Sequence, residues 1–148
     1  MWGVGGVMEI WEVVARECIR DVATTYNSNG DAGRFEPLME VFAEDSVMEL
    51  PDRTYTGKAE ISGIFTGART KLTGATPSYV RHFGATHKIE LVDEQNATGR
   101  LYFLVITRIG LDHWGRYVDR YKLIDGKWRI HHRKVIIDGT TDGSVMIG

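Results

Sequence analysis

Apolar residues recur along this chain with two different spacings, and the change of spacing divides the sequence. Up to about residue 72 they recur every three or four positions, which is the period of an amphipathic helix. From Tyr79 to Asp138 the chain consists almost entirely of runs of strand-forming residues separated by short, turn-like breaks. The pattern predicts a helical first half followed by a sheet.

Three helices are predicted in the first half. Their expected bounds are 8–26, 35–43 and 57–72, with short strands at 46–50 and 54–56 between the second and the third. The first helix carries an apolar stripe that ends at Tyr26, and the turn-forming cluster 27–33 is expected to terminate it. Cys18 falls on this stripe, so we expect it to be a small buried residue.

Four long strands are predicted in the second half. They are expected at 79–93, 97–109, 115–124 and 127–138. Their connections are short, so neighbouring strands should pair antiparallel. Helices followed by strands predict an α+β fold in which the helices pack on one face of an antiparallel sheet.

The strand expected at 97–109 is apolar on both of its faces between Leu101 and Ile109. One face should pack on the helices, and a face exposed to water would normally carry polar residues. An apolar outer face predicts that a second copy of the chain covers it. We therefore expect a homo-oligomer, a dimer or a trimer, assembled through the outer sheet face.

Length and charge narrow the class of protein. The 148 residues suit one domain, which we place at 8–140 between a flexible N-terminal tail at 1–7 and a C-terminal tail at 141–148. A net charge of −2 argues against nucleic acid as a partner, and a single cysteine excludes an internal disulfide. No apolar run reaches membrane-spanning length and no signal peptide is visible, so we expect a cytoplasmic protein without a membrane partner.

Four segments, in this order and spacing, resemble the SnoaL-like family of the nuclear transport factor 2-like superfamily. They are Tyr26 to Asp31 followed by FAEDSVMEL, then YTGKAEISGIF, then RHFGATHKIELVDEQNATGR, and finally GRYVDRYKLIDGKWRI. The resemblance covers residues 10–138. It implies a cone-shaped α+β barrel, in which a curved antiparallel sheet wraps around three N-terminal helices and encloses a deep apolar pocket.

The resemblance also implies a catalytic set, because the family includes scytalone dehydratase, a bile acid 7α-dehydratase and hexachlorocyclohexane dehydrochlorinase. His82 stands where such enzymes place a general base or acid, and Tyr26 where the dehydratases place a pocket tyrosine. Asp31 stands where the bile acid dehydratase and the dehydrochlorinase place the carboxylate that orients the histidine. Each residue also has a structural interpretation. Asp31 could cap a turn, Tyr26 could end the core stripe, and His82 could be a hydrogen-bonded core histidine.

Residues on one face of the central strands are expected to bind the substrate. They are Phe103, Val105, Thr107, Tyr117 and Asp119. The first three make the pocket more apolar than those of the two dehydratases. Asp119 would be costly to bury alone, so it could instead form an ion pair with Arg133 or Lys134. His87 is expected at the surface or at the rim of a strand.

The function expected from these residues is a cofactor-independent lyase or isomerase, and we favour a dehydratase acting on a small hydrophobic ring such as a steroid, terpenoid or polyketide. No metal is expected, because adjacent His131 and His132 point to opposite faces of a strand. The alternatives are a protein that only binds a small hydrophobic ligand and an adaptor that uses its outer sheet face. A hydrogen bond between His82 and Asp31 beside a cavity would favour the enzyme.

Overall fold

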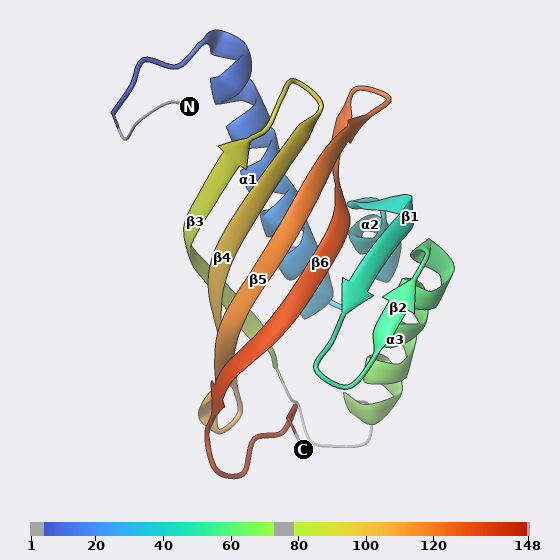
Figure 1. Ribbon diagram of the computed structural model, residues 1–148. Coiled ribbons are helices and arrows are strands. Elements are labelled where there is room, and N and C mark those ends of the chain that lie inside the picture. The colour runs from blue at the N-terminus through green and yellow to red at the C-terminus, as the bar shows by residue number, and fades with distance from the viewer. Residues whose placement is uncertain (1–4, 73–78, 148) are drawn as a thin grey trace.

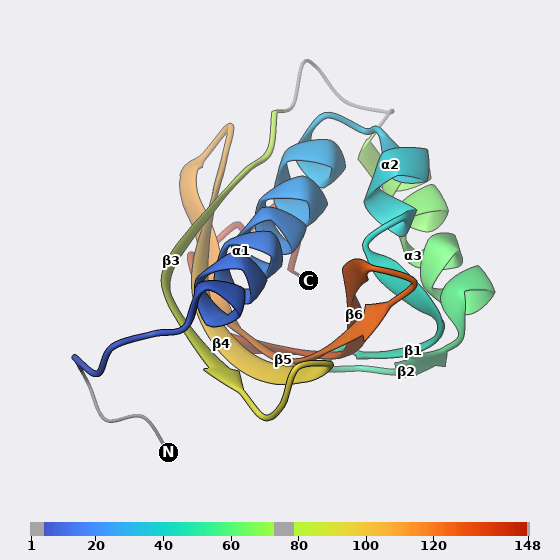
Figure 2. The ribbon, with the colours of Figure 1, turned by 90° about the horizontal axis from the view of Figure 1, so that it is seen from above.

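A curved six-stranded sheet holds three helices on its concave side (Figures 1 and 2). This architecture comes from a computed structural model that describes residues 5–72 and 79–147, without the side chains of 68–72. The helices are α1 (Ile10–Asp31), α2 (Phe35–Met39) and α3 (Lys58–Leu72). The strands are β1 (Phe42–Glu49), β2 (Thr54–Thr56), β3 (Arg81–Leu91), β4 (Asn96–Thr107), β5 (Gly110–Ile124) and β6 (Lys127–Thr140).

The strand order is β2-β1-β6-β5-β4-β3, and the sheet does not close. All neighbouring strands run antiparallel except β1 and β6, which pair in parallel. The predicted α+β cone is therefore confirmed, with one parallel pair in a sheet that was expected to be fully antiparallel. Figure 2 shows α1 lying inside the cup, with α2 and α3 beside β1.

Helix α1 is longer than its sequence predicts. The turn-forming residues 27–31 continue it to Asp31, and the amide of Asn29 donates to the carbonyl oxygen of Thr25 across 2.9 Å. The helix ends only before Gly33, whose φ of 71° is the left-handed conformation that glycine adopts without strain after a helix. The prediction of an end at Tyr26 is wrong, and Asp31 lies in the last turn of a helix rather than in a loop.

The buried face of α1 also differs from the expected stripe. Ile19, Val22, Ala23 and Tyr26 are buried as predicted, but Ile10, Val13 and Val14 are 78%, 49% and 54% exposed. Cys18, expected inside, is exposed as well. The side of the N-terminal half that faces the sheet carries Glu12 instead, which closes a capping box with Glu9. Periodicity finds an apolar stripe, but the surroundings decide how much of it is covered.

Two strand boundaries correct the sequence prediction. Residues 42 and 43, expected to end the second helix, begin β1, because the backbone at this point pairs with β6 and Ile130 N–H donates to the Val41 carbonyl across 2.7 Å. Strand β5 begins at Gly110 rather than at residue 115, since the turn from β4 is tighter than expected. The short strand β2 and helix α3 lie where they were predicted.

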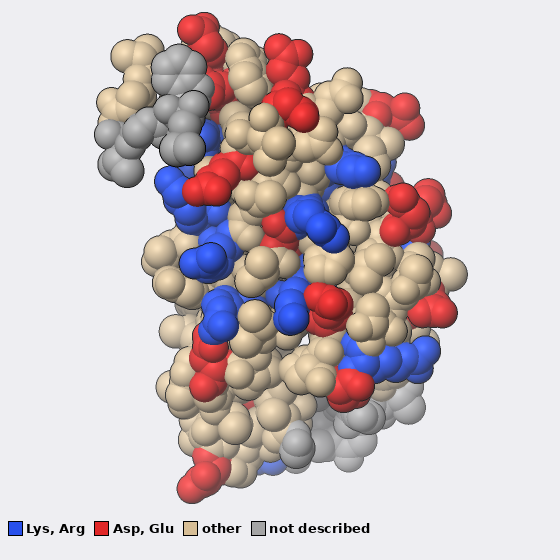
Figure 3. Space-filling view, viewed as in Figure 1, with Lys and Arg blue, Asp and Glu red and all other residues tan. Residues whose placement is uncertain are grey.

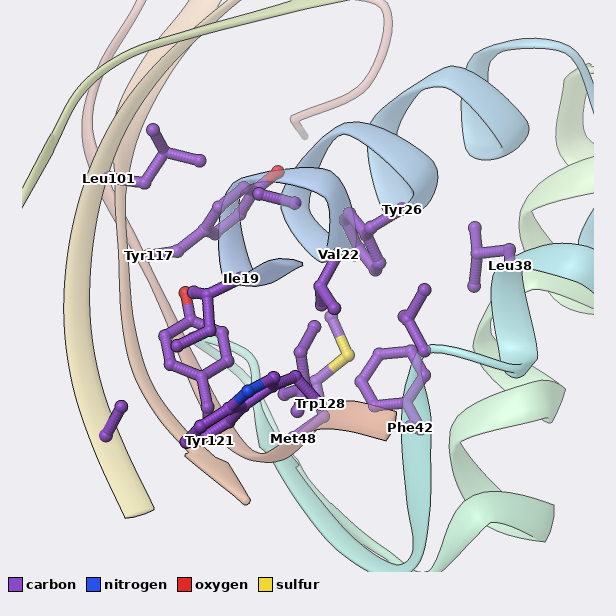
Figure 4. Packing of buried hydrophobic residues seen from close by; sticks show 14 of the residues in the cluster. Ile19, Val22, Tyr26, Leu38, Phe42, Met48, Leu101, Tyr117, Tyr121 and Trp128 are labelled. Atoms are coloured by element: carbon purple, nitrogen blue, oxygen red, sulfur yellow. The ribbon is translucent and has the colours of Figure 1, made fainter. Parts of the chain in front are cut away.

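The core lies between α1 and the concave face of the sheet, as Figure 4 shows. Its members come from every layer, and those labelled are Ile19, Val22, Tyr26, Leu38, Phe42, Met48, Leu101, Tyr117, Tyr121 and Trp128. Burying side chains of this size contributes about 1.5–3 kcal/mol each, so this contact surface is what fixes α1 against the strands.

The outer face of the sheet carries both apolar and charged side chains. Tyr102, Leu104 and Trp114 are 48%, 39% and 37% exposed on it, which agrees with the apolar outer positions predicted for β4. Figure 3, which views this face, shows lysine and arginine side chains across the strands between stretches of uncharged surface. Within 5–72 and 79–147, no helix is long and apolar enough to cross a membrane.

Candidate active site

His82 and Asp31 form a tightly hydrogen-bonded pair. Nδ1 of His82 lies 2.6 Å from Oδ1 of Asp31, and the backbone N–H of His82 donates to Oδ2 across 2.8 Å. The side chains are 19% and 11% exposed, so both are largely shielded from water and still accessible. The contact expected between these two residues is present.

The two residues meet because α1 runs past its predicted end. Asp31 is the last residue of that helix, and His82 is the second residue of the edge strand β3. His82 pairs with Val105 of β4, whose side chain is fully buried, so the imidazole lies on the concave face. A shorter helix would not bring the carboxylate to the strand.

A pocket of about 690 Å³ opens beside the pair, between α1 and β3. Asp31 and His82 both line it, and its apolar wall includes Ala23, Ala85 and Leu101. This volume falls within the range of roughly 300–1,000 Å³ that small-molecule sites occupy. The His–Asp pair therefore faces a space that can hold a ligand.

The carboxylate of Asp31 determines which nitrogen of His82 carries the proton. An ionised carboxylate only accepts hydrogen bonds, so Nδ1 must donate to Oδ1. The neutral ring then keeps its lone pair on Nε2, and a proton taken up there is stabilised by the charge of Asp31. This arrangement suits a general base that later returns the proton as an acid.

Asp119 forms a buried ion pair with Arg133. It accepts from Nε of Arg133 across 2.9 Å and from Nη2 across 2.8 Å, and both residues are fully buried. Of the alternatives that the sequence left open for Asp119, pairing with Arg133 is the one present. Burial lowers the pKa of Arg133, but the charge and hydrogen bonds of Asp119 outweigh it and hold the guanidinium charged.

Tyr26 lies in an aromatic cluster around this ion pair. The guanidinium of Arg133 lies 4.3 Å from the ring centroid of Tyr26 and 4.0 Å from that of Tyr117. Nη1 of Arg133 is buried and has no hydrogen-bond partner among the residues that the structure describes, and the two ring faces supply favourable electrostatics in its place. Burial raises the pKa of Tyr26 and of Tyr117, so both hydroxyls stay protonated.

The predicted substrate-binding residues lie on the concave face, where the sequence placed them. Phe103, Val105, Thr107 and Tyr117 are all buried, and the rings of Phe103 and Tyr117 stack with centroids 4.6 Å apart. Among the residues that the structure describes, the lining of the pocket beside His82 includes none of these four, nor Tyr26 or Asp119. Their contact with a substrate stays a prediction.

Sequence reasoning missed a second His–Asp pair. Nδ1 of His113 lies 2.8 Å from Oδ1 of Asp112, and both residues are buried. Val105 pairs with His113 and Ile106 with Leu111, so Asp112 is the extra residue of a bulge that turns adjacent residues inward. Asp112 also accepts from Ser144 Oγ and Val145 N–H, which ties the C-terminal tail to the sheet. A strict alternation of apolar and polar residues along a strand does not predict such a bulge.

His87 lies on the concave side, not at the surface or rim as expected. It is half-buried, lines the pocket, and its Nε2 lies 3.2 Å from the hydroxyl of Tyr121. Burial and the charges of Arg133 and Arg20 lower its pKa, against the raising effect of Asp119. No three His, Cys, Asp or Glu side chains in the described part of the chain are placed to hold a metal ion.

The open α+β cone with helices on its concave side is the cystatin-like, or nuclear transport factor 2-like, fold. The sequence matches the SnoaL-like domain over residues 11–134, so the chain belongs to the SnoaL-like domain family. No curated protein matches it significantly.

Solved structures share this fold at low sequence identity. A protein provisionally assigned as a scytalone dehydratase from Novosphingobium aromaticivorans is 24% identical, with a TM-score of 0.81 and 91% of each chain covered. LinA is 16% identical, with a TM-score of 0.77 and coverage of 90% of this chain and 94% of its own. ActVI-ORFA from Streptomyces coelicolor is 16% identical, with a TM-score of 0.73 and coverage of 84% and 97%.

Proposed function

We propose that this protein is a cofactor-independent lyase of the dehydratase type, acting on a small hydrophobic ring substrate. The observation that carries the proposal is the hydrogen bond of 2.6 Å between His82 and Asp31 at the wall of a pocket. A similar fold in a provisionally assigned scytalone dehydratase supports it. Such a pair can act on a substrate that has an acidic C–H bond and a hydroxyl group on the next carbon.

The reaction needs one proton to move twice. Nε2 of His82 removes a proton from the carbon next to a carbonyl group, and Asp31 stabilises the imidazolium that forms. The electrons of the broken C–H bond form a C=C bond while the neighbouring C–O bond breaks. The imidazolium returns its proton to the departing oxygen, which leaves as water. The ring regains its starting state, so no oxidant or reductant is consumed.

A panel of cyclic β-hydroxyketones tests the proposal, because loss of water gives a conjugated enone whose ultraviolet absorbance can be followed. General acid–base catalysis typically contributes about 10²–10⁴-fold, so His82→Ala and Asp31→Asn should each lower kcat/KM by a factor in that range. The matched controls are His131→Ala and Asp45→Asn, which alter a surface His–Asp contact of 3.3 Å away from the pocket.

The controls should keep wild-type activity, and all four variants should keep the wild-type circular dichroism. If a ketone is dehydrated by the wild-type protein and equally well by His82→Ala, the assignment of the base is wrong. If ring ligands bind in the pocket but none of the panel reacts, a protein that only binds such ligands is the better description.

A further inference from the structure

A bulge in β3 brings a second histidine into the pocket of His82. Residues five apart on a regular strand point to opposite faces. Here Ala85 pairs with Tyr102 and Lys88 with Arg100, so Thr86 and His87 together oppose the single residue Leu101. Thr86 adopts a φ of 54°, and the extra residue shifts the alternation so that His87 faces the same way as His82.

Neighbouring residues leave room for His87 in this position. A Cβ atom built on Gly99 would lie 2.8 Å from Cε2 of Tyr121 and 3.2 Å from Nε2 of His87. Only glycine at this point of β4 lets both rings approach the strand. The hydrogen bond between them therefore depends on three strands, β3, β4 and β5.

A chain of hydrogen bonds determines the protonation of His87. Arg133 occupies both oxygens of Asp119, and the hydroxyl of Tyr121 donates to Oδ2 of that carboxylate across 2.6 Å. A hydroxyl has one proton, so the Tyr121 oxygen can only accept from His87. Nε2 of His87 is therefore the donor, and the neutral ring has its lone pair on Nδ1.

Nδ1 of His87 makes no hydrogen bond with the residues that the structure describes. It is an acceptor on a pocket wall, so it calls for a ligand group that donates. Arg20 lines the same pocket, and its charge acts on His87. A cationic donor would be repelled by Arg20, and a carboxylate has no proton to give. A hydroxyl group satisfies both neighbours, because it donates to the imidazole and can accept from the guanidinium.

We propose that His87 is a specificity-determining residue that accepts a hydrogen bond from a hydroxyl group at the far end of the ligand from the His82–Asp31 pair. This inference rests on the proposed function, since it assigns a polar contact to the ligand of the same pocket. His82 and His87 are separated by about 13 Å along β3, taking about 3.3 Å per residue and one residue absorbed in the bulge. The ligand is thus elongated and hydroxylated at the end that meets His87.

Binding of two matched probes, 4-hydroxybiphenyl and 4-methylbiphenyl, tests the proposal by calorimetry. They have similar size, and only the first can donate a hydrogen bond. A net hydrogen bond contributes about 0.5–1.5 kcal/mol, so the wild-type protein should prefer the hydroxyl probe by roughly 2- to 12-fold. His87→Leu should abolish that preference, and His87→Gln should retain part of it, since its amide oxygen can accept in place of Nδ1.

The control variant is His131→Gln, which lies outside the pocket and should keep the full preference. The proposal is overturned if the preference survives in His87→Leu, if it is lost in His82→Leu instead, or if neither probe binds. These outcomes do not depend on turnover, so a failed assignment of His87 is distinguishable from a failed assignment of the reaction. If His82→Ala loses turnover but keeps the wild-type probe preference, the result supports the role of His82 in the reaction and the role of His87 in binding separately.

Discussion

At the scale of single residues, this protein uses hydrogen bonds to carboxylates to decide where protons sit. Asp31 accepts from both the ring and the backbone of His82, and Asp119 accepts from Arg133 and Tyr121. Each carboxylate therefore fixes the donor or acceptor role of a group near the pocket. The sequence alone contains these residue types, but the partners come from different strands and only the fold brings them together.

The pH dependence of stability should reveal the burial of His87. Its pKa is lowered in the folded state by burial and by the charges of Arg133 and Arg20, with Asp119 opposing them. The unfolded state, with a pKa of about 6.5, then binds more protons, so stability falls as the pH drops below about 6.5. His132 adds a shift of the same sign. The free energy of unfolding, measured with urea across this pH range, should fall less steeply in His87→Gln than in the wild-type protein. An unchanged slope against pH would contradict the burial of His87.

At the scale of elements, one extended helix and one bulge build the site, and a second bulge anchors the C-terminal tail. Helix α1 carries Asp31 to the edge strand, the bulge in β3 turns His87 inward, and the bulge in β5 turns Asp112 inward. Strand β3 was expected, but a bulge changes the alternation by one residue and leaves no regular mark in the sequence. The bulge in β5 lies in residues 110–114, which were expected to form a turn. The expected end of α1 was wrong for a related reason: turn-forming residues were given more weight than the packing that keeps the helix intact.

The contact between His82 and Asp31 could be predicted because the position of His82 at the head of a strand and the match of Asp31 to a family pattern are both visible in the sequence, whereas the catalytic role of His82 stays a prediction. The prediction for His87 failed because strict alternation from His82 places it on the opposite face. Asp119 was recognised as a buried charge that needs a partner, and the partner is one of the two cations named for it.

The bulge in β3 should contain measurable backbone strain at Thr86. A β-branched residue at a φ of 54° is unfavourable, and glycine adopts this conformation freely. Thr86→Gly should therefore raise the free energy of unfolding by up to about 2.5 kcal/mol, because the relieved strain of about 1–3 kcal/mol exceeds the cost of about 0.5–1 kcal/mol for the entropy that glycine loses on folding. Thr98→Gly, in the regular part of β4, is the control and should destabilise. A lower melting temperature for Thr86→Gly would contradict this account of the bulge.

At the scale of the whole molecule, the C-terminal tail is part of the fold. Burial alone would raise the pKa of Asp112, but hydrogen bonds from Ser144, His113, Val145 and Thr107 outweigh it and lower the pKa to about 2. The predicted C-terminal tail at 141–148 thus includes residues held by a buried carboxylate. Docking of this segment could not be foreseen, because its apolar run at 145–147 is too short to show a period and its anchor, Asp112, lay in a predicted turn.

Acid unfolding should report on Asp112. Its folded pKa lies below the ordinary value of 3.8, so its contribution to stability is complete above about pH 4 and is lost as the pH falls toward about 2. Asp112→Asn should lower stability near neutral pH by about 1.5–3 kcal/mol, the usual size of a hydrogen bond to a charged group, and should flatten the acid profile. The control is the exposed Asp142→Asn. Equal stability of the two variants would show that the tail is not anchored in this way.

Self-association through the outer sheet face stays a prediction. Phe83, Tyr102 and Leu104 are 56%, 48% and 39% exposed there, which is costly for a monomer in water. Light scattering at micromolar concentration should give the mass of a dimer or trimer, and Leu104→Glu should convert it to a monomer. Val92→Glu, at another exposed apolar position, should leave the mass unchanged. A monomeric wild-type protein would contradict the prediction.

The central claim is that Asp31 holds the proton of His82 on Nδ1 and leaves Nε2 as the base. A long-range ¹H–¹⁵N correlation spectrum of the histidine rings, recorded near neutral pH, observes this directly and needs no substrate. The neutral ring of His82 should appear as the Nδ1–H tautomer in the wild-type protein and should shift toward the Nε2–H tautomer in Asp31→Asn, because the amide no longer offers two accepting oxygens. An Nε2–H tautomer in the wild-type protein would contradict the account.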